Sequence, residues 1–158
     1  MALFDVRELI KMAIKDEDTG ISFYRGLAES TGTDQVKEHC LAISKEEEGH
    51  KKRFQAMLDD IGDVEPVEEY AGQYENYVNS LLKSRAFPEP GQAEEEARNA
   101  SSDAEALDVA MRLEKDTLLF LQEMRQFVSD DHKEYVDKVV NEERKHLTDL
   151  NALKEEIA

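Results

Sequence analysis

The chain has 158 residues, enough for one domain with a substantial core, and its seven glycines and three prolines favour helices over turn-rich strands. The 37 acidic residues outnumber the 20 basic ones and give a formal net charge of -17, which disfavours nucleic acid and anionic membranes as partners. The single cysteine excludes an intrachain disulfide and the four-cysteine iron site of rubredoxin-type modules.

The first predicted helix covers residues 5–31, with Asp5 and Glu8 as a capping pair at its start. Apolar and small side chains recur at spacings of three and four, which is typical of a helix face turned toward a bundle core. Glu17 interrupts this stripe near the middle of the helix, where an apolar residue is expected. The stripe otherwise consists of Val6, Ile10, Ala13, Gly20, Tyr24 and Leu27.

The second predicted helix, residues 34–61, has a similar stripe with two interruptions. Glu47 and His50 occupy core-facing positions near mid-helix. They lie inside the charged stretch KEEEGHKKRF, whose other charges we assign to the solvated face. The stripe otherwise consists of Val36, Cys40, Ile43, Phe54, Met57 and Ile61.

A long connection, residues 62–101, follows the second helix. A helix of ~26 residues is ~39 Å long at ~1.5 Å per residue, so a chain that returns along the bundle needs such a crossover. The stretch PEPGQAEEEARNASS, residues 88–102, is predicted to be loop. A short helix is predicted before it, from the helical spacing of Tyr70, Tyr74, Tyr77, Leu81 and Leu82.

Two further helices are predicted after the crossover, at 103–129 and 132–157, and polar residues again interrupt their core stripes near mid-helix. The interrupting residue is Glu114 in the first, one turn before Thr117 on the same stripe, and Glu143 and His146 in the second. The predicted capping pairs are Ser102 with Glu105, and Asp131 with Glu134.

The two helix pairs are related by an internal duplication. AIKDEDTGISFYRGL aligns with AMRLEKDTLLFLQEM, and ISKEEEGHKKRF aligns with VVNEERKHLTDL. The alignment matches Glu17 with Glu114, and the Glu-x-x-His pair of the second helix with that of the fourth. Both the helix pairs and the positions of their core-facing polar residues therefore repeat.

These elements predict an all-α fold, a ferritin-like four-helix bundle over residues 1–158 as a single domain. The short connections at 32–33 and 130–131 make two antiparallel hairpins, and one long crossover containing a short helix joins them. Mid-helix residues of an antiparallel bundle meet at one height. Six polar groups therefore converge in the core: Glu17, Glu47, His50, Glu114, Glu143 and His146.

A Glu-x-x-His pair projects both side chains from one helix face toward a common centre. A lone pair of this kind in a Glu-rich helix is usually an accident of composition. Here the stripes offer no core cation, and four unpaired buried carboxylates would each cost several kcal/mol. Four carboxylates and two imidazoles without thiolate suit iron or manganese, and this is the ligand pattern of di-iron and di-manganese bundles.

The chain resembles the rubrerythrin family of ferritin-like di-iron proteins over essentially its whole length, in EDTGISFY, EEGH followed by Phe54, ALDVAMRLEKD and ERKH. Bacterioferritin-type proteins share the same six ligands. The resemblance implies that the six polar residues bind two iron ions, with Glu47 and Glu143 as bridges. Tyr24 either hydrogen-bonds a ligand carboxylate or serves as an amphipathic core tyrosine.

Two departures from the family pattern affect the expected activity. Many rubrerythrins carry a further Glu one turn after the third-helix ligand, where this chain has Thr117. The rubredoxin module of the family is also missing, so electrons are expected from a separate donor such as a rubredoxin-type carrier. Leu121 stands where the duplicated helix has Tyr24, which makes the two halves of the site unequal.

We expect a di-iron oxidoreductase that reacts with peroxide or dioxygen, in the cytoplasm and as a homodimer. The cytoplasmic expectation rests on the absence of a signal-peptide pattern and of an apolar run near the ~20 residues that span a bilayer. A ferritin-like ferroxidase or iron-binding protein, a dimanganese centre and a metal-free interaction bundle remain alternatives. His39 and His132 are assigned to the bundle ends or surface.

Overall fold

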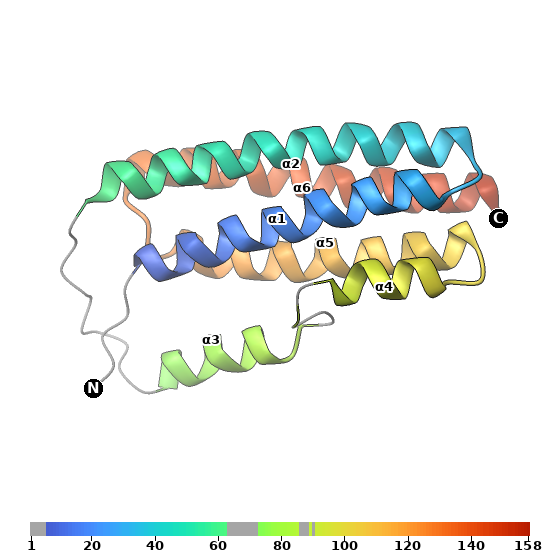
Figure 1. Cartoon of the computed structure of the whole chain (residues 1–158). Helices are drawn as coiled ribbons and strands as arrows, with labels where there is room; N and C mark the ends of the chain where they lie inside the picture. Colours follow the sequence, from blue (N-terminus) through green and yellow to red (C-terminus); the bar gives the residue numbers. More distant parts are fainter. Residues whose placement is uncertain (1–5, 63–72, 86–88, 90) are drawn as a thin grey trace.

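The computed structural model describes residues 6–62, 73–85, 89 and 91–158, and its regular structure in these residues is entirely helical (Figure 1). The helices are α1 (Val6–Ser30), α2 (Asp34–Ile61), α3 (Gln73–Lys83), α4 (Gln92–Asn99), α5 (Asp103–Arg125) and α6 (Asp130–Ile157). α1 and α2 form one hairpin and α5 and α6 a second, and these four long helices make the bundle. The predicted all-α bundle with one long crossover is confirmed.

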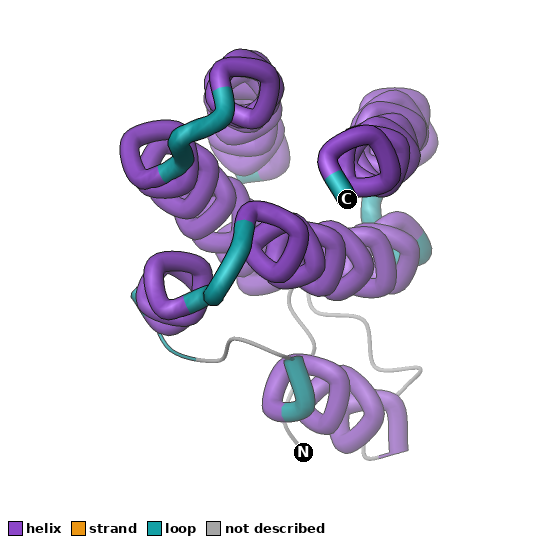
Figure 2. Tube along the Cα trace, turned by 90° about the vertical axis from the view of Figure 1, so that its right-hand side faces the viewer, coloured by secondary structure: helices purple, strands orange, loops and turns teal. Residues whose placement is uncertain are grey.

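The crossover helices α3 and α4 both lie on the α1 and α5 side of the bundle, as the view along the helices shows (Figure 2). α4 packs against α1 and α5 through Ala93 and Ala97, which are 1% and 7% exposed. α3 adds Val78, buried against the apolar residues of the bundle. Tyr70, and the side chains of Tyr74 and Leu82, lie outside the described residues.

The loop predicted at 88–102 is wrong in part, because α4 occupies its centre. Gly91, with φ 80° and ψ -10°, precedes the helix in the left-handed conformation that glycine adopts without strain. The two buried alanines are four residues apart, so they form a narrow apolar face. The glutamates around them dominate the local composition and hide this face in the sequence.

The helix ends agree with the predicted caps at one point and differ at others. Ser102 Oγ accepts a hydrogen bond from the Glu105 N–H at 3.2 Å, as predicted. The Glu105 carboxylate accepts from the Ser101 N–H at 2.9 Å, one residue before the expected donor. α5 ends at Arg125 and α6 begins at Asp130, so Asp131 lies in the first turn and the predicted cap there is wrong. The predicted cap residue Asp5 lies outside the described residues.

The hydrophobic core consists of two clusters at opposite ends of the bundle, and the polar residues of the predicted site lie between them. One cluster, near the α1–α2 turn, includes Phe23, Leu27, Val36, Cys40, Leu107 and Leu150. The other, near the opposite end, includes Leu9, Phe54, Phe120, Met124, Val136 and Val139. Packing of apolar side chains therefore fixes the helices relative to one another on both sides of the polar residues.

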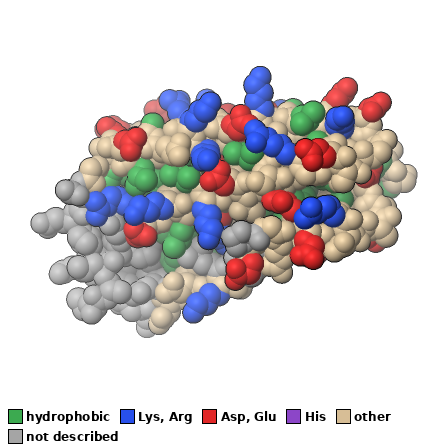
Figure 3. Space-filling model, viewed as in Figure 1, with side chains coloured by type: hydrophobic (Ala, Val, Ile, Leu, Met, Phe, Trp, Pro, Cys, Tyr) green, Lys and Arg blue, Asp and Glu red, His purple; other side chains and the backbone are tan. Residues whose placement is uncertain are grey.

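Acidic and basic side chains are interspersed along the face of the molecule seen in Figure 3. None of the described helices is both long enough and apolar enough to cross a membrane.

Candidate metal centre

The structure brings together six charged or polar side chains at the middle of the bundle, one from each of α1 and α5 and two from each of α2 and α6. All six are at most 4% exposed, although each would be ionised or strongly solvated in water. We call them the Glu–His cluster: Glu17, Glu47, His50, Glu114, Glu143 and His146. They are the residues that interrupt the apolar stripes of the sequence.

Glu143 lies between the two histidines. Its Oε1 is 3.0 Å from His50 Nδ1, and its Oε2 is 3.0 Å from His146 Nδ1. The ring centroids of the two imidazoles are 6.2 Å apart. His146 Nδ1 is also 3.5 Å from Glu47 Oε1, and His50 Nδ1 is 3.5 Å from Glu17 Oε2. Both histidines therefore turn Nδ1 toward carboxylates of the Glu–His cluster.

The cluster contains two groups of four side chains whose ligand atoms lie within 4.8 Å of one another. One group holds Glu17 and His50, and the other holds Glu114 and His146. Glu47 and Glu143 belong to both groups. The two groups therefore share two carboxylates, and each group includes one histidine.

The Glu47 carboxylate lies directly against the backbone of α1 at Gly20. A Cβ atom built at Gly20 would overlap Glu47 Oε2, so only glycine leaves the carboxylate its present position. In the duplicated half, the aligned position on α5 is Thr117. The two halves of the cluster therefore differ in the space beside their shared carboxylates.

Burial and mutual repulsion perturb the protonation of the carboxylates. Burial raises the pKa of Glu17, Glu47 and Glu114 well above the ordinary 4.5, and neighbouring carboxylates raise it further. Burial also opposes ionisation of Glu143, but its contacts with His146 and His50 outweigh that effect and hold its pKa well below the ordinary value. Glu143 is therefore the carboxylate that ionises most readily, whereas the other three carboxylates favour the protonated form.

The contacts that lower the pKa of Glu143 raise the pKa of the two histidines. Burial by itself would lower the pKa of both histidines, but the contact with Glu143 outweighs it. The pKa of His50 rises to about 9 and that of His146 to about 12. Without a metal, both rings are therefore protonated at neutral pH, and they flank the ionised Glu143 carboxylate.

Several buried atoms of the cluster make no hydrogen bond to any described residue: both carboxylate oxygens of Glu17, His50 Nδ1 and Glu143 Oε1. The last two are 3.0 Å apart but are not aligned for a hydrogen bond. An unsatisfied buried polar atom costs ~1–3 kcal/mol or more, so such atoms call for a partner. Their convergence in one group of four is what a cation would satisfy, and the donor set fits a divalent metal.

The Tyr24 hydroxyl donates a hydrogen bond to Glu114 Oε1, and the tyrosine is fully buried. Burial and the Glu114 charge raise the pKa of Tyr24, so the hydroxyl keeps its proton. Thr117 is 8% exposed and lines a small cavity of about 20 Å³ with Asp16 and Arg85. Of these two predicted neighbours of the ligands, Tyr24 thus has a direct contact with a cluster carboxylate.

The other two histidines lie away from the cluster. His39 Nδ1 is 3.2 Å from the Gln35 carbonyl of its own helix. His132 Nε2 is 3.0 Å from Asp60 Oδ2 and joins the start of α6 to the end of α2.

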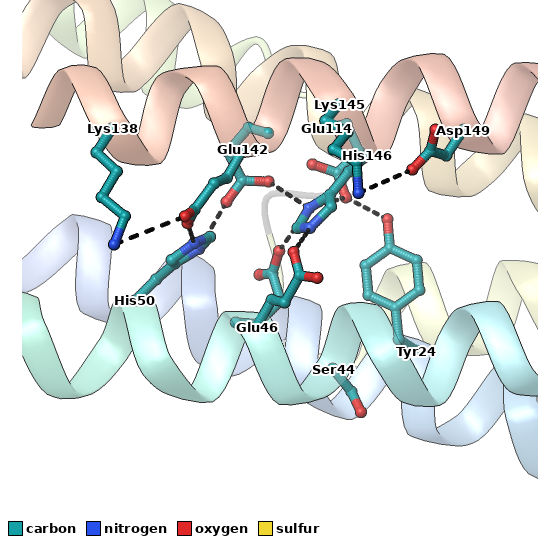
Figure 4. A network of polar contacts seen from close by, with 12 residues as sticks. Tyr24, Ser44, Glu46, His50, Glu114, Lys138, Glu142, Lys145, His146 and Asp149 are labelled. Carbon is teal, nitrogen blue, oxygen red and sulfur yellow. Dashed lines mark hydrogen bonds and ion pairs between the residues drawn. The ribbon is translucent and has the colours of Figure 1, made fainter.

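Two residues of the site escaped the sequence reasoning. The sequence pattern assigns Glu46 to the solvated face and does not distinguish Glu142, yet each contacts a cluster histidine (Figure 4). The signal is a glutamate directly before the core-facing one, Glu46 before Glu47 and Glu142 before Glu143, in both duplicated segments. Periodicity alone assigns both to solvent, because each lies one residue outside the core stripe.

The rubrerythrin family model matches residues 8–154. The fold is similar to a crystal structure from Thermotoga maritima, named as a ferritin-like diiron-carboxylate protein, with a TM-score of 0.76 and 24% identity over 100% of this chain and 99% of that one. A hypothetical protein from Pyrococcus furiosus is similar with a TM-score of 0.69 and 23% identity, over 96% of this chain and 89% of that one. No curated protein sequence matches the chain.

Proposed function

Because the chain belongs to the rubrerythrin family, we propose that it is a non-haem di-iron oxidoreductase whose Glu–His cluster binds two iron ions and serves the reduction of peroxide or dioxygen. The observation that carries the proposal is the pair of overlapping four-residue groups. Four carboxylates offset the charge of two divalent ions, and oxygen and nitrogen ligands without thiolate suit iron.

The side chains take distinct roles in this proposal. Glu47 and Glu143 bridge the two metal positions, while Glu17 with His50 completes one position and Glu114 with His146 the other. Bound iron would supply the electrons and the Lewis acidity that reduction of the oxidant needs. The helices fix the ligands at mid-bundle, and the apolar clusters on either side exclude bulk water.

Tyr24 and Thr117 make the two metal positions unequal. Tyr24 fixes one oxygen of Glu114 and has no counterpart in the duplicated half, where Leu121 stands. Thr117 adds a buried hydroxyl one turn after Glu114 on α5, without adding a carboxylate. We therefore assign Tyr24 the positioning of a ligand, and Thr117 a place beside the small cavity that it lines with Asp16 and Arg85.

The proposal includes a separate electron-donor protein, such as a rubredoxin-type carrier, because the single cysteine cannot form a four-thiolate iron site. We also propose that the protein is cytoplasmic and that it forms a homodimer. The buried Cys40 suits a reducing compartment. Size-exclusion chromatography with light scattering tests the dimer, and a monomer would contradict it.

Metal analysis of the protein purified without oxygen tests the metal assignment, with two equivalents of iron as the expected result. Stopped-flow oxidation of the diferrous protein then tests the activity. Peroxide should oxidise the protein faster than it oxidises free ferrous ion under the same conditions. Equal rates would contradict the peroxidase assignment, and absence of bound metal would contradict the site.

Replacement of either shared carboxylate, Glu47→Ala or Glu143→Ala, is expected to abolish most metal binding, because each side chain belongs to both groups. Replacement of Glu17 is expected to affect one equivalent only, because Glu17 belongs to one group. Metal content per chain after dialysis measures both effects. Full stoichiometry in either bridging variant would contradict the shared role.

A ferroxidase or iron-storage role is the second candidate, and the net charge of -17 favours it because an acidic surface concentrates cations. Particle mass separates the two candidates, since storage needs a large closed shell. A dimanganese centre would use the same ligands, and the metal analysis distinguishes it from iron.

A further inference from the structure

Each cluster histidine makes one contact on its outer side as well as those within the cluster. His50 Nε2 is 2.5 Å from Glu142 Oε2, and His146 Nε2 is 2.7 Å from Glu46 Oε2 (Figure 4). An ionised carboxylate can only accept, so each Nε2 carries the hydrogen and donates it. The inner nitrogen, Nδ1, is thereby the one left for a metal.

The outer contacts cross from one helix to the other. Glu46 precedes the bridging Glu47 on α2, but its carboxylate holds the histidine of α6. Glu142 precedes the bridging Glu143 on α6, and its carboxylate holds the histidine of α2. In each Glu-Glu-x-x-His segment, the second glutamate and the histidine belong to the cluster, and the first glutamate contacts the histidine of the opposite segment.

The two outer glutamates lie at the boundary between the cluster and solvent. Their side chains are 47% and 36% exposed, while the histidine side chains they contact are 3% and 4% exposed. A half-exposed carboxylate keeps its hydration while it orients a buried ring. This placement separates them from the cluster carboxylates, which are all buried.

We infer that Glu46 and Glu142 are positioning residues that act crosswise on the two metal positions. Glu46 supports the position formed by His146 with Glu114, and Glu142 supports the position formed by His50 with Glu17. Each carboxylate fixes the ring orientation and tautomer of its histidine and makes Nδ1 a stronger ligand. The inference rests on the proposed function, because it requires that the cluster bind metal.

The test uses variants that retain only one metal position. In a Glu17→Ala background, the remaining ion should be the one held by His146. Addition of Glu46→Ala should then weaken its binding about 10–100-fold, the usual effect of losing such a support, while Glu142→Ala should change it little. In a Glu114→Ala background, the effects of the two substitutions should be exchanged.

Cobalt(II) serves as the probe, with affinity measured by competition against a chelator and coordination by visible absorption. Control variants are Glu48→Ala on α2, whose 37% exposed side chain pairs with Arg25, and Asp149→Ala on α6, whose 42% exposed side chain pairs with Lys145. Both controls remove a negative charge from the same helices and should leave the affinity and the spectrum unchanged. Circular dichroism of the metal-free proteins checks folding, and Gln variants replace any Ala variant that fails to fold.

Several outcomes would overturn the crosswise assignment. These are equal weakening of both positions by either substitution, an effect of each glutamate on the histidine of its own helix, or effects no larger than those of the controls. If the unmodified protein binds no cobalt, the proposed function fails. If it binds two equivalents and the single-position variants show no crosswise pattern, only the present inference fails.

Discussion

At the scale of single residues, the Glu–His cluster depends on a glycine, Gly20, as well as on its six side chains. Gly20 lies on α1 three residues after Glu17, and its lack of a Cβ leaves room for the Glu47 carboxylate of α2. Glycine in a helix interior costs ~0.5–1 kcal/mol relative to alanine. The helix therefore gives up some stability to let the Glu47 carboxylate, which belongs to both four-residue groups, lie close to its backbone.

Gly20→Ala is expected to weaken metal binding while leaving the fold intact, because the new methyl group displaces Glu47. Gly26→Ala is the matched control on the same helix, since nothing lies within 4 Å of a Cβ built there. The control should raise the free energy of unfolding by ~0.5–1 kcal/mol and bind metal normally. Cobalt titration and urea unfolding measure the two effects. Equal metal affinity in the two variants would show that Glu47 has room to move.

At the scale of the helices, one hydrogen bond fixes where the second hairpin begins. Ser102 accepts from the Glu105 N–H, one of the backbone donors that a helix start leaves without a partner. Thr31 and Thr33, from the connection between α1 and α2, donate to Asp103 Oδ2 at 2.9 and 2.6 Å. The start of α5 is thus tied to the turn of the first hairpin.

Ser102→Ala is expected to lower the free energy of unfolding by ~1 kcal/mol, because the Glu105 N–H loses its acceptor. Ser101→Ala, one residue earlier, serves as the control. The contact of Ser101 with Glu105 uses its backbone N–H, which alanine retains. Urea unfolding of both variants measures the difference, and an equal loss in the two would exclude a capping role for the Ser102 hydroxyl.

The long helices could be predicted from the sequence because their stripes are strongly periodic, and a polar residue on such a stripe is conspicuous. Glu17 and Glu143 stand out in this way. α4 escaped because its buried face consists of only two alanines, Ala93 and Ala97, among glutamates. Glu46 and Glu142 escaped because contacts between helices decide their role, and periodicity within one helix carries no information on those contacts.

At the scale of the whole molecule, the metal-free protein should become less stable as the pH rises. The pKa of His50 rises from 6.5 to about 9 in the folded state, and that of His146 to about 12. The folded chain thus binds these protons more tightly than the unfolded chain, so the stability they contribute below pH 6.5 is lost as the pH rises through the folded values. The raised pKa of Glu17, Glu47 and Glu114 acts in the same direction above pH 4.5.

Calorimetry of the metal-free protein should therefore show a falling Tm between pH 6.5 and 9. Glu143 has the opposite sign, because its pKa is lowered, and its contribution is lost only below pH 4.5. Metal-loaded protein should lose little stability over the same range, since its ligands are already deprotonated. A Tm of the metal-free protein that rises from pH 6.5 to 9 would contradict these protonation states.

The division of the core into two apolar clusters also determines how small molecules can reach the centre by diffusion. A helix of 28 residues, such as α2, is ~42 Å long, so the cluster at its middle is ~20 Å from either end. Packed side chains fill both stretches along the bundle axis. A solute travelling along that axis would have to displace a close-packed interior, whereas a sideways route between two helices crosses a single layer of side chains. We therefore expect small molecules to reach the centre through the flanks of the bundle, at a rate that depends on the few side chains that close them.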